Sequence, residues 1–539
     1  MRLRAATAHR RGVILLAVLI VVALLLLIGY KYFNLMNAEL EGAVASNKIT
    51  QARRLADSAL HYAQFILAHP ETAGLTADAT TRFVSPYLVY DNPELFHQRP
   101  VTDASGNLVG YFSLVSPRSP DDPMAGQQGF RFGVEDESGK INLNWLMRLN
   151  REDASGERAR DLLARLPSMS TEMAQSITNW MKAGNDSGDS MYYASLRYGP
   201  KYGPFETLEE LLYVRGITPR LLLGNDRNRN YTVEPEENDA GGYLDPGLAA
   251  YFTVYSREMN VDSQWQPRTF INDVNLQTVY DKLVSAVGAD LAGFIMAYRR
   301  WGPLQQTAVP IGRGGGGGRG RSTVTVDGGP DAKTLDLANA DTSRLTNISS
   351  LFDLVEARVA VTTQNPNGGT TETIYRSPLQ ISKPEILAQY LPILFDKFTT
   401  DERMELPSRI NINSAPAEVL QALPNMTTAD VQKILAARPA LGSVDPSQAA
   451  LFASPVWLVT AAQINPANLR QWESYITTRT QVFRVQAVGY YEAGGPMVRI
   501  EAVIDGNCGR PRLLYWRELT DLGRGFPFSQ SRPILMQDR

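Results

Sequence analysis

The chain begins with a long apolar segment. Every residue from Val13 to Ile28 is apolar, and no charged residue occurs between Arg11 and Lys31. As a helix, this uncharged segment would measure about 28 Å, which is enough to cross the apolar core of a bilayer. We therefore predict that residues 13–30 span a membrane.

The helical pattern continues beyond this segment. Residues 31–69 place small and apolar side chains at steps of three and four, the spacing of one helix face. These side chains are Leu35, Ala38, Gly42, Ala45, Ile49, Ala52, Ala56, Ala59, Ala63 and Ile66. His69 and Pro70 end the pattern. The small side chains favour packing on a sheet over a coiled-coil seam, so we predict one unbroken helix that lies against the protein's own sheet.

Segments typical of β-strands occur near both ends of the chain. They are residues 111–115, 130–134, 482–491, 497–505 and 513–516. We predict that they form one antiparallel sheet from two parts of the chain, 70–139 and 479–539. Everything from about 140 to 475 would then be an insertion. The predicted fold class is α+β: a long, pilin-like N-terminal helix packed on an antiparallel sheet, with a large, mainly helical insertion.

The insertion contains an internal repeat. Three segments align without gaps, and each follows an asparagine-rich stretch. The aligned segments are Leu166–Ile177, Val284–Ile295 and Leu423–Ile434, and the preceding stretches are 141–144, 271–275 and 410–413. Segment 208–217 resembles a partial fourth copy. Each copy predicts a helix, a tight turn and a second helix, as in SAM-like and helix-hairpin-helix domains. We therefore expect helical domains over 140–300 and 401–478.

The residues between these helical domains are less regular. Glycine dominates residues 312–320, which predicts a flexible linker over 301–334. This stretch lacks the Lys-Ser/Thr ending of a P-loop, which argues against nucleotide binding. Within 335–400 we predict only one pair of strands, at 355–363 and 370–376.

Composition argues for several folded units without catalytic chemistry. The chain has 539 residues, 44% hydrophobic and 20% charged, with a net charge of −3. Its length fits roughly three to four domains. Cys508 is the single cysteine, which excludes an intrachain disulfide and a cysteine metal cluster. Neither G-x-S-x-G nor H-E-x-x-H occurs, and the four histidines are scattered. We therefore predict a protein that is not an enzyme.

The residues before the apolar segment form a basic leader. Four arginines precede Gly12, and they favour retention of this flank in the cytoplasm. Three interpretations are open: a secretory signal peptide, an uncleaved anchor, and a type IV prepilin leader (residues 1–12) cleaved between Gly12 and Val13. A signal peptide would have a shorter apolar region and a small-residue cleavage site. The long helical continuation favours the prepilin leader.

One loop has the ligand spacing of a calcium site. Oxygen-bearing residues occupy positions 1, 3, 5, 7, 9 and 12 of the loop, as in an EF-hand. They are Asp226, Asn228, Asn230, Thr232, Glu234 and Glu237. Position 6 is Tyr231, where the EF-hand has glycine, and two arginines in the loop would oppose a cation. A calcium site and a polar surface loop without metal both remain open.

Helical hairpins can also bind nucleic acid. DNA-binding hairpins use a G-x-G turn that presents backbone N–H groups to phosphate. The corresponding turns here are 168–170 and 425–427, neither of which contains glycine, and 215–218, which matches only half of the pattern. Lysine and arginine are sparse nearby. We therefore expect no nucleic acid partner, and a membrane-anchored helix-hairpin-helix protein for DNA binding and uptake remains the alternative function.

Several motifs resemble the K-type minor pseudopilins of type II secretion systems. They are the basic leader with its apolar helix, Gly139–Asn144, Phe205–Gly216 and Ile410–Pro416. Most pilins carry a glutamate at the fifth position after the cleavage site. This position is Ala17 here, and the K-type family lacks that glutamate too. Residues 300–400 depart from the family pattern.

The resemblance implies a structural function. It implies processing by prepilin peptidase, one span in the lipid of the inner membrane, and a periplasmic location for the bulk of the chain. It also implies a place at the tip of the pseudopilus, where the protein would bind I- and J-type minor pseudopilins through its N-terminal helix, initiate assembly and support protein export. Calcium binding in the inserted domain is a further implied property. A type IV pilus minor pilin is a related alternative.

Overall fold

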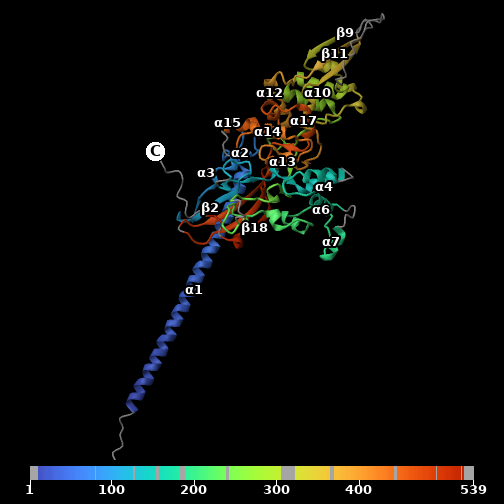
Figure 1. Ribbon diagram of the computed structural model, residues 1–539. Coiled ribbons are helices and arrows are strands. Elements are labelled where there is room, and N and C mark those ends of the chain that lie inside the picture. Colours follow the sequence, from blue (N-terminus) through green and yellow to red (C-terminus); the bar gives the residue numbers. More distant parts are fainter. Residues whose placement is uncertain are drawn as a thin grey trace, which may run out of the picture.

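The protein consists of one long helix, a β-sheet at the end of this helix, one unit beside the sheet and two further units beyond it (Figure 1). The structure, a computed structural model, describes residues 10–526 except 79–80, 126–127, 153–156, 183–188, 238–241, 305–321, 365–369, 442–445, 493 and 524. Most of the predicted leader, the glycine-rich segment 312–320 and the last residues of the predicted tail therefore lie outside the described residues.

The predicted N-terminal helix is one unbroken element. α1 spans Arg10–Ala68, or 59 residues, and ends shortly before Pro70, which has no N–H to continue the helical hydrogen bonds. Its apolar half is exposed from Ile14 to Ile28. Its second half becomes buried from Ala52 onward.

Strands from both ends of the chain form one sheet, as predicted. Its order is β1-β2-β16-β17-β18, with every neighbouring pair antiparallel. These strands span Arg99–Thr102, Leu108–Pro117, Val482–Tyr490, Val498–Asp505 and Arg512–Glu518. Two short strands are added, β3 (Phe130–Phe132) on β2 and β4 (Glu135–Asp136) on β16. The β2–β16 pairing joins the two ends of the sequence. Helices α2 (Pro86–Tyr90) and α3 (Pro93–Phe96) precede β1.

α1 packs on one face of this sheet through small side chains. Ala52, Ala56 and Ala59 are fully buried. The approach is closest at Gly489 of β16, where a Cβ atom would lie 2.2 Å from the Ala52 carbonyl oxygen and 2.6 Å from the Ala56 nitrogen. The helix backbone therefore lies directly on the strand, and only glycine leaves room for it.

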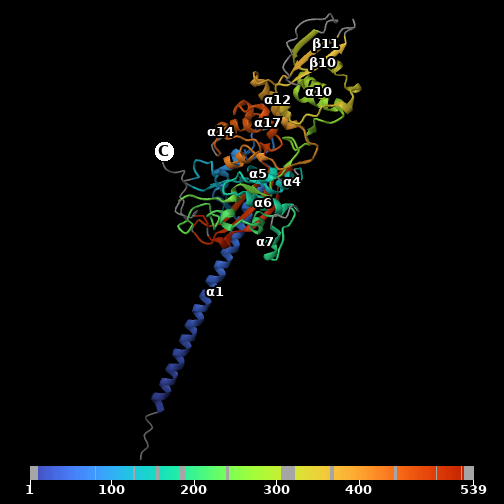
Figure 2. The same cartoon turned by 45° about the vertical axis from the view of Figure 1, so that its right-hand side comes forward.

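Three successive units form the insertion, and each is closed by a two-residue parallel strand pair. The pairs are β5 (Ile141–Asn142) with β6 (Phe252–Thr253), β8 (Thr269–Phe270) with β12 (Phe398–Thr399), and β14 (Ile410–Asn411) with β15 (Ile476–Thr477). We call residues 141–253 the first unit, 269–399 the second and 410–477 the third. In both views the second unit lies farthest from α1, with the third between it and the sheet (Figure 1, Figure 2). One further pair, β7 (Glu258–Met259) with β13 (Glu405–Leu406), connects the segments that separate the units.

The units consist mainly of short helices, and the second unit also contains strands. The first unit contains α4 (Leu143–Glu152), α5 (Glu157–Leu163), α6 (Thr171–Met181), α7 (Asp189–Ser195), the 3₁₀ helix η2 (Leu208–Tyr213) and α8 (Pro219–Leu223). The second contains α9 (Leu276–Val287), α10 (Ala289–Trp301), β9 (Ser322–Asp327), α11 (Ala332–Leu335), η6 (Leu351–Leu354), β10 (Arg358–Gln364), β11 (Thr370–Arg376) and α12 (Pro384–Lys397). The third contains α13 (Ala417–Ala422), α14 (Thr428–Ala437), α15 (Pro446–Ala449), α16 (Trp457–Thr460) and α17 (Pro466–Trp472).

Each aligned repeat segment contains the turn between two helices. These helix pairs are α5 with α6, α9 with α10, and α13 with α14. In the first and third units the turn uses a residue with positive φ, 58° at Ser168 and 57° at Asn425. A hydroxyl side chain two residues later, Ser170 or Thr427, then caps the next helix. Caps of this kind satisfy backbone N–H groups that the helix itself leaves unpaired.

The asparagines of the repeat hold the backbone of their own unit. The residue two positions after each opening strand is Asn144, Asn272 or Asn413. The Asn272 side chain donates to the Ile348 carbonyl and accepts from the Ile348 N–H, both at 2.9 Å. Asn144 makes the same two bonds with Phe205. Asn413 donates to the Phe452 carbonyl at 2.8 Å. These asparagines therefore have a structural role, with each bond contributing about 1 kcal/mol.

One segment of the insertion is a partial repeat, and one expectation needs correction. Segment 208–217 repeats only part of the aligned pattern: its first helix is the 3₁₀ helix η2, but Gly216 has a φ of 86° and Thr218 caps α8, as Ser170 and Thr427 cap their helices. Ser322–Asp327, which we placed in a flexible linker, forms β9. It pairs in parallel with β11, and β11 pairs with β10 as the predicted strand pair. The domain boundaries drawn from the sequence stay predictions.

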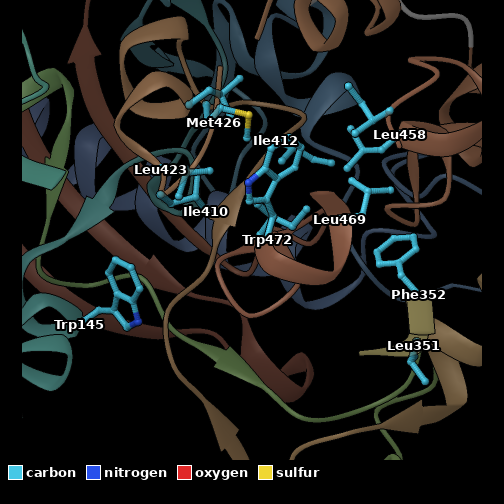
Figure 3. Packing of buried hydrophobic residues seen from close by; sticks show 14 of the residues in the cluster. Trp145, Leu351, Phe352, Ile410, Ile412, Leu423, Met426, Leu458, Leu469 and Trp472 are labelled. Atoms are coloured by element: carbon cyan, nitrogen blue, oxygen red, sulfur yellow. The ribbon is translucent and has the colours of Figure 1, made fainter. Parts of the chain in front are cut away.

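Apolar side chains run continuously through the three units. Figure 3 shows Trp472, Ile412 and Leu423 within the third unit, with Phe352 of η6 beside Leu469 of α17. All five side chains are at most 1% exposed. This shared core joins the second unit to the third, so the units form one body.

Substitution of Gly489 tests the contact between α1 and the sheet. Because a side chain there would meet helix backbone, which has little freedom to move, we expect Gly489→Val to lower the free energy of unfolding by about 1–3 kcal/mol. Chemical denaturation of the detergent-purified chain measures this loss. Gly199→Ala is the control, since no atom lies within 4 Å of a Cβ there. Equal loss in both variants would contradict the packing argument.

Candidate functional site

The sheet face opposite α1 is charged and yet buried. Along β16, side chains alternate between the α1 core and this second face, so Val485 packs under α1 while Arg484 and Gln486 point away from it. On β17, Arg499 and Glu501 are 0% and 4% exposed. These charged residues alternate with apolar residues along the strand. In a sheet that is covered on one face only, such charged residues would face water. Here the first unit covers them.

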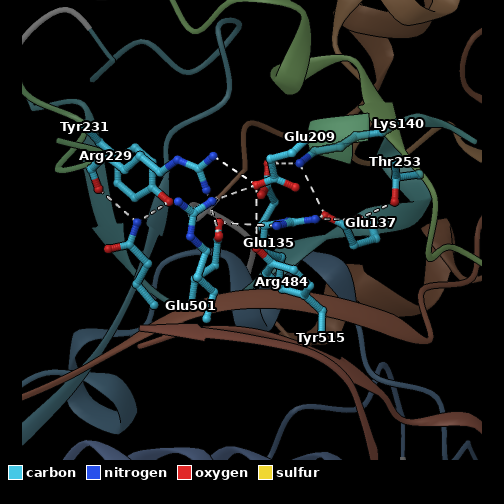
Figure 4. A network of polar contacts seen from close by, with 12 residues as sticks. Glu135, Glu137, Lys140, Glu209, Arg229, Tyr231, Thr253, Arg484, Glu501 and Tyr515 are labelled. Carbon is cyan, nitrogen blue, oxygen red and sulfur yellow. Dashed lines mark hydrogen bonds and ion pairs between the residues drawn. The ribbon is translucent and has the colours of Figure 1, made fainter. Parts of the chain in front are cut away.

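An ion-pair network holds the first unit on this face (Figure 4). Arg484 contacts Glu137 at 2.8 Å and Glu501 at 3.2 Å. Arg229 contacts Glu501 at 2.9 Å and Glu209 at 3.1 Å. Charges from β16 and β17 are thus paired with charges from the first unit and from the residues just before it.

Glu137 is the carboxylate at the centre of this network. Burial by itself would raise the pKa of Glu137, but the nearby charges of Arg484 and Lys140 outweigh that effect and lower it to about 2. Lys140 reaches Glu135 at 2.9 Å and Glu137 at 3.3 Å. Breaking a buried pair by removing one partner costs several kcal/mol, because the other charge is left unpaired. The network therefore favours one position of the first unit relative to the sheet.

The predicted cation loop lies on the same face. Gln486 of β16 donates to the Tyr231 hydroxyl at 2.8 Å and to the Arg229 carbonyl at 2.9 Å. Arg499 of β17 donates to the Asn228 carbonyl at 2.8 Å. Asn230 donates to the Gly525 carbonyl at 3.1 Å. The loop is therefore held by the sheet and by the residues that follow β18. The sequence pattern did not reveal these supports, because they come from strands more than two hundred residues away.

The loop makes the sharp turn that its spacing requires. Tyr231, at the glycine position of the motif, has a φ of 60°, in the left-handed region that glycine adopts most easily. Asp226 accepts from the Asn230 N–H at 3.0 Å and from the Tyr231 N–H at 2.9 Å. Thr232 donates its N–H and hydroxyl to the Asn230 side-chain oxygen. The absence of glycine therefore does not prevent the turn.

The remaining predicted ligands lie close to these residues. Asn228 and Asn230 donate to the two carboxylate oxygens of Glu234 at 2.8 and 3.0 Å. Glu237 accepts from the Arg227 N–H at 2.8 Å through Oε1. Its Oε2 atom is buried and has no hydrogen-bond partner among the described residues. The structure thus brings all six predicted residues together in one compact loop.

The charges around the loop are compatible with a cation. Arg229, which we expected to oppose a cation, directs its guanidinium to Glu209 and Glu501 instead, and Arg227 is exposed. Burial, followed by backbone hydrogen bonds that oppose it and the charge of Glu237 that adds to it, raises the pKa of Asp226 to about 6. Within the described part of the chain, however, no group of three or more Asp, Glu, His or Cys side chains has a metal-binding arrangement. A cation bound here would therefore need amide, hydroxyl and backbone oxygens as ligands in addition to the carboxylates, and calcium accepts such ligands.

The membrane segment is the second functional element. α1 from Ile14 is long and apolar enough to cross a membrane, with a mean hydropathy of 2.8 in its best window and none of that window buried. This fits a single-pass membrane anchor. The predicted processing residues Gly12 and Val13 lie in the first turn of α1, and Ala17 lies within the apolar segment.

Comparison with known proteins supports one system. The family model described as type II secretion system (T2SS), protein K matches residues 410–458. These residues run from β14 to α16 in the third unit. No curated protein matches the chain. The match points to a role in type II secretion, in a family whose protein K is a structural pseudopilin and not an enzyme.

The raised pKa of Asp226 generates a pH dependence. Without divalent cations, the folded protein holds the Asp226 proton up to about pH 6, whereas the unfolded chain releases it near the ordinary value of 3.8. The free energy of unfolding should therefore fall by about 2–3 kcal/mol as the pH rises from 3.8 to about 6. Asp226→Asn should remove this component, and the exposed Asp281→Asn should retain it. Denaturant titrations from pH 3.5 to 7 measure both, and identical profiles for wild type and Asp226→Asn would contradict the expectation.

Proposed function

We propose that this protein is a non-catalytic minor pseudopilin at the tip of a type II secretion pseudopilus, where it initiates assembly and supports protein export. One observation carries the proposal: α1 is a single helix whose second half packs on the sheet while its first half stays exposed. An exposed apolar helix can serve both as a membrane anchor and as a packing element for the helices of other subunits. The match to protein K of the secretion system supports this assignment.

The shape of the head supports the proposed tip position. The third and second units extend beyond the sheet, on the side away from the membrane half of α1 (Figure 1, Figure 2). A subunit stacked above would have to occupy the space of these units. Ala17 is consistent with this position. A glutamate there would carry a charge into lipid, and only a subunit with a neighbour above it could pair that charge.

The partners of the proposed function are the I- and J-type minor pseudopilins, bound through α1, with prepilin peptidase acting between Gly12 and Val13. The chain would lie in the inner membrane with one span and keep its head in the periplasm. Residues 40–49 of α1 are exposed outside the apolar span, with Leu40 64% exposed. They provide the surface that neighbouring helices would cover.

We also propose that the loop 226–237 binds calcium. The six residues Asp226, Asn228, Asn230, Thr232, Glu234 and Glu237 would supply oxygen ligands, and the ion would compensate the buried charges of Asp226 and Glu237. The same loop contacts β16 and β17. Bound calcium would therefore stabilise the packing of the first unit on the sheet.

Calcium should raise the thermal unfolding temperature of the purified chain, and a chelator should reverse the effect. An ion that binds only the folded state at a hundred times its Kd contributes about 2.7 kcal/mol. Glu237→Gln should abolish the shift, because the unpaired Oε2 atom loses its charge. The neighbouring exposed Glu236→Gln should keep it. No calcium shift in wild type, or an equal shift in Glu237→Gln, would overturn the calcium proposal.

Co-purification tests the proposed assembly. We expect the processed chain to co-purify from membranes with its I- and J-type partners, and Leu40→Arg to reduce recovery of the partners at least about tenfold, since a charge on the helix surface opposes apolar packing. Leu451→Arg, on an equally exposed leucine of the third unit, should have no effect.

N-terminal sequencing of the same material gives an independent result. The proposal requires a mature chain that begins at Val13. A chain that begins at Met1 and yields no partner in the wild type would identify a plain membrane anchor instead.

A further inference from the structure

A cavity of about 500 Å³ lies where the three units meet. Its lining comes from the segment after α1, from α4 of the first unit, from α12 and η6 of the second unit, and from the closing strand of the third. This volume is typical of small-molecule sites. It is far larger than an inorganic anion requires.

The repeat places a basic residue at one fixed position beside this junction. Lys140, Arg268 and Arg409 each stand directly before the opening strand of their unit. Lys140 pairs with Glu135 and Glu137. Arg409 makes two bonds to Glu258, at 2.9 and 2.5 Å. Two of the three equivalent positions thus have a carboxylate partner within the protein.

Arg268 differs from its two counterparts. It lines the cavity, and its side chain makes no ion pair or hydrogen bond with any of the residues that the structure describes. Its Nε atom is fully buried. Burial, followed by the positive charge of Arg479, lowers its pKa well below the usual range. The negative charges of Glu258 and Asp396 act in the opposite direction, but neither carboxylate forms an ion pair with the half-buried Arg268 side chain.

The nearby carboxylates are engaged by other groups. Glu258 is held by Arg409. Asp396 accepts from Arg479 at 2.9 Å and from the Ser263 hydroxyl at 2.9 Å. Glu473 is half-buried and accepts from the Ser350 hydroxyl. Glu258 and Asp396 therefore act on the Arg268 charge only from a distance, and none of the described residues accepts a hydrogen bond from its guanidinium.

Aromatic side chains line part of the cavity, among polar and charged residues. Trp145, Phe352 and Phe398 line it and are at most 8% exposed, and Phe83 and Tyr475 line it too. A ligand for this cavity would need an apolar body in addition to a negative group. Guanidinium groups match the planar geometry of carboxylates with two parallel hydrogen bonds.

We propose that the cavity binds a carboxylate carried on an apolar or aromatic body, with Arg268 as the anchor for the carboxylate. The aromatic wall would bind the body of the ligand and exclude water around the ion pair. The site is independent of the proposed secretion function, because it is defined by the isolated chain and needs no partner subunit.

Calorimetry on the full detergent-purified chain tests the site with three probes. 3-Phenylpropionate should bind, whereas its neutral amide and inorganic phosphate should bind at least about tenfold more weakly, since a bond between charged groups is worth about 1.5–3 kcal/mol. Equal binding of the amide would show that the charge is irrelevant. Equal binding of phosphate would show that the site takes any anion. Either result would overturn the proposal.

Two variants separate binding from folding. Arg268→Met should lose 3-phenylpropionate binding about tenfold or more and should unfold at the same temperature as wild type or higher, because the Arg268 side chain makes no hydrogen bond or ion pair with the described residues. The exposed Arg344→Met should bind as wild type; Arg344 is 85% exposed. Retained binding in Arg268→Met, or a lower unfolding temperature for it without ligand, would overturn the assignment, since the second result is that of a structural arginine.

Discussion

The pairing of β2 with β16 is the constraint on which the rest of the structure depends. Its backbone hydrogen bonds bring residues 111–115 against 486–490, so the chain must leave the sheet after β4 and return only at β16. Closing so long a loop is entropically costly and slow. Each unit closes itself with its own parallel strand pair, which reduces that cost to a series of shorter steps.

The two faces of this sheet have different tasks. One face accepts α1 through alanines and Gly489, and this packing fixes the direction in which the membrane half of the helix leaves the head. The other face holds the first unit through Arg484, Glu137 and Glu501. The loop 226–237 rests on that same face. The loop therefore belongs to the connection between the first unit and the sheet, on the face that α1 does not cover.

Repetition explains much of the insertion, and its exceptions point to chemistry. The asparagines at 144, 272 and 413 do the same structural task in each unit. The basic residues before the opening strands differ in their roles. Lys140 and Arg409 have carboxylate partners, whereas Arg268 faces a cavity. A repeated position whose basic side chain makes no ion pair with the described residues is a place where a ligand carboxylate can bind.

The sequence by itself determined the elements whose patterns are local. The apolar run and alanine stripe predicted α1, strand alternation predicted most of the sheet, and the aligned segments predicted the turns between helices. Ligand spacing predicted the loop from Asp226 to Glu237. These features depend on neighbours within a few residues, so they are visible without a structure.

Only the tertiary structure decided what depends on distant contacts. β9 was missed because its strand character arises from pairing with β11. Arg484 and Glu501 have the alternation of solvent-facing residues and are buried only because the first unit covers them. The loop's contacts with Gln486 and Arg499, and the isolation of Arg268 beside a cavity shared by three units, likewise join parts far apart in the chain. The free energy of these groups is set by their surroundings, and no local pattern records those surroundings.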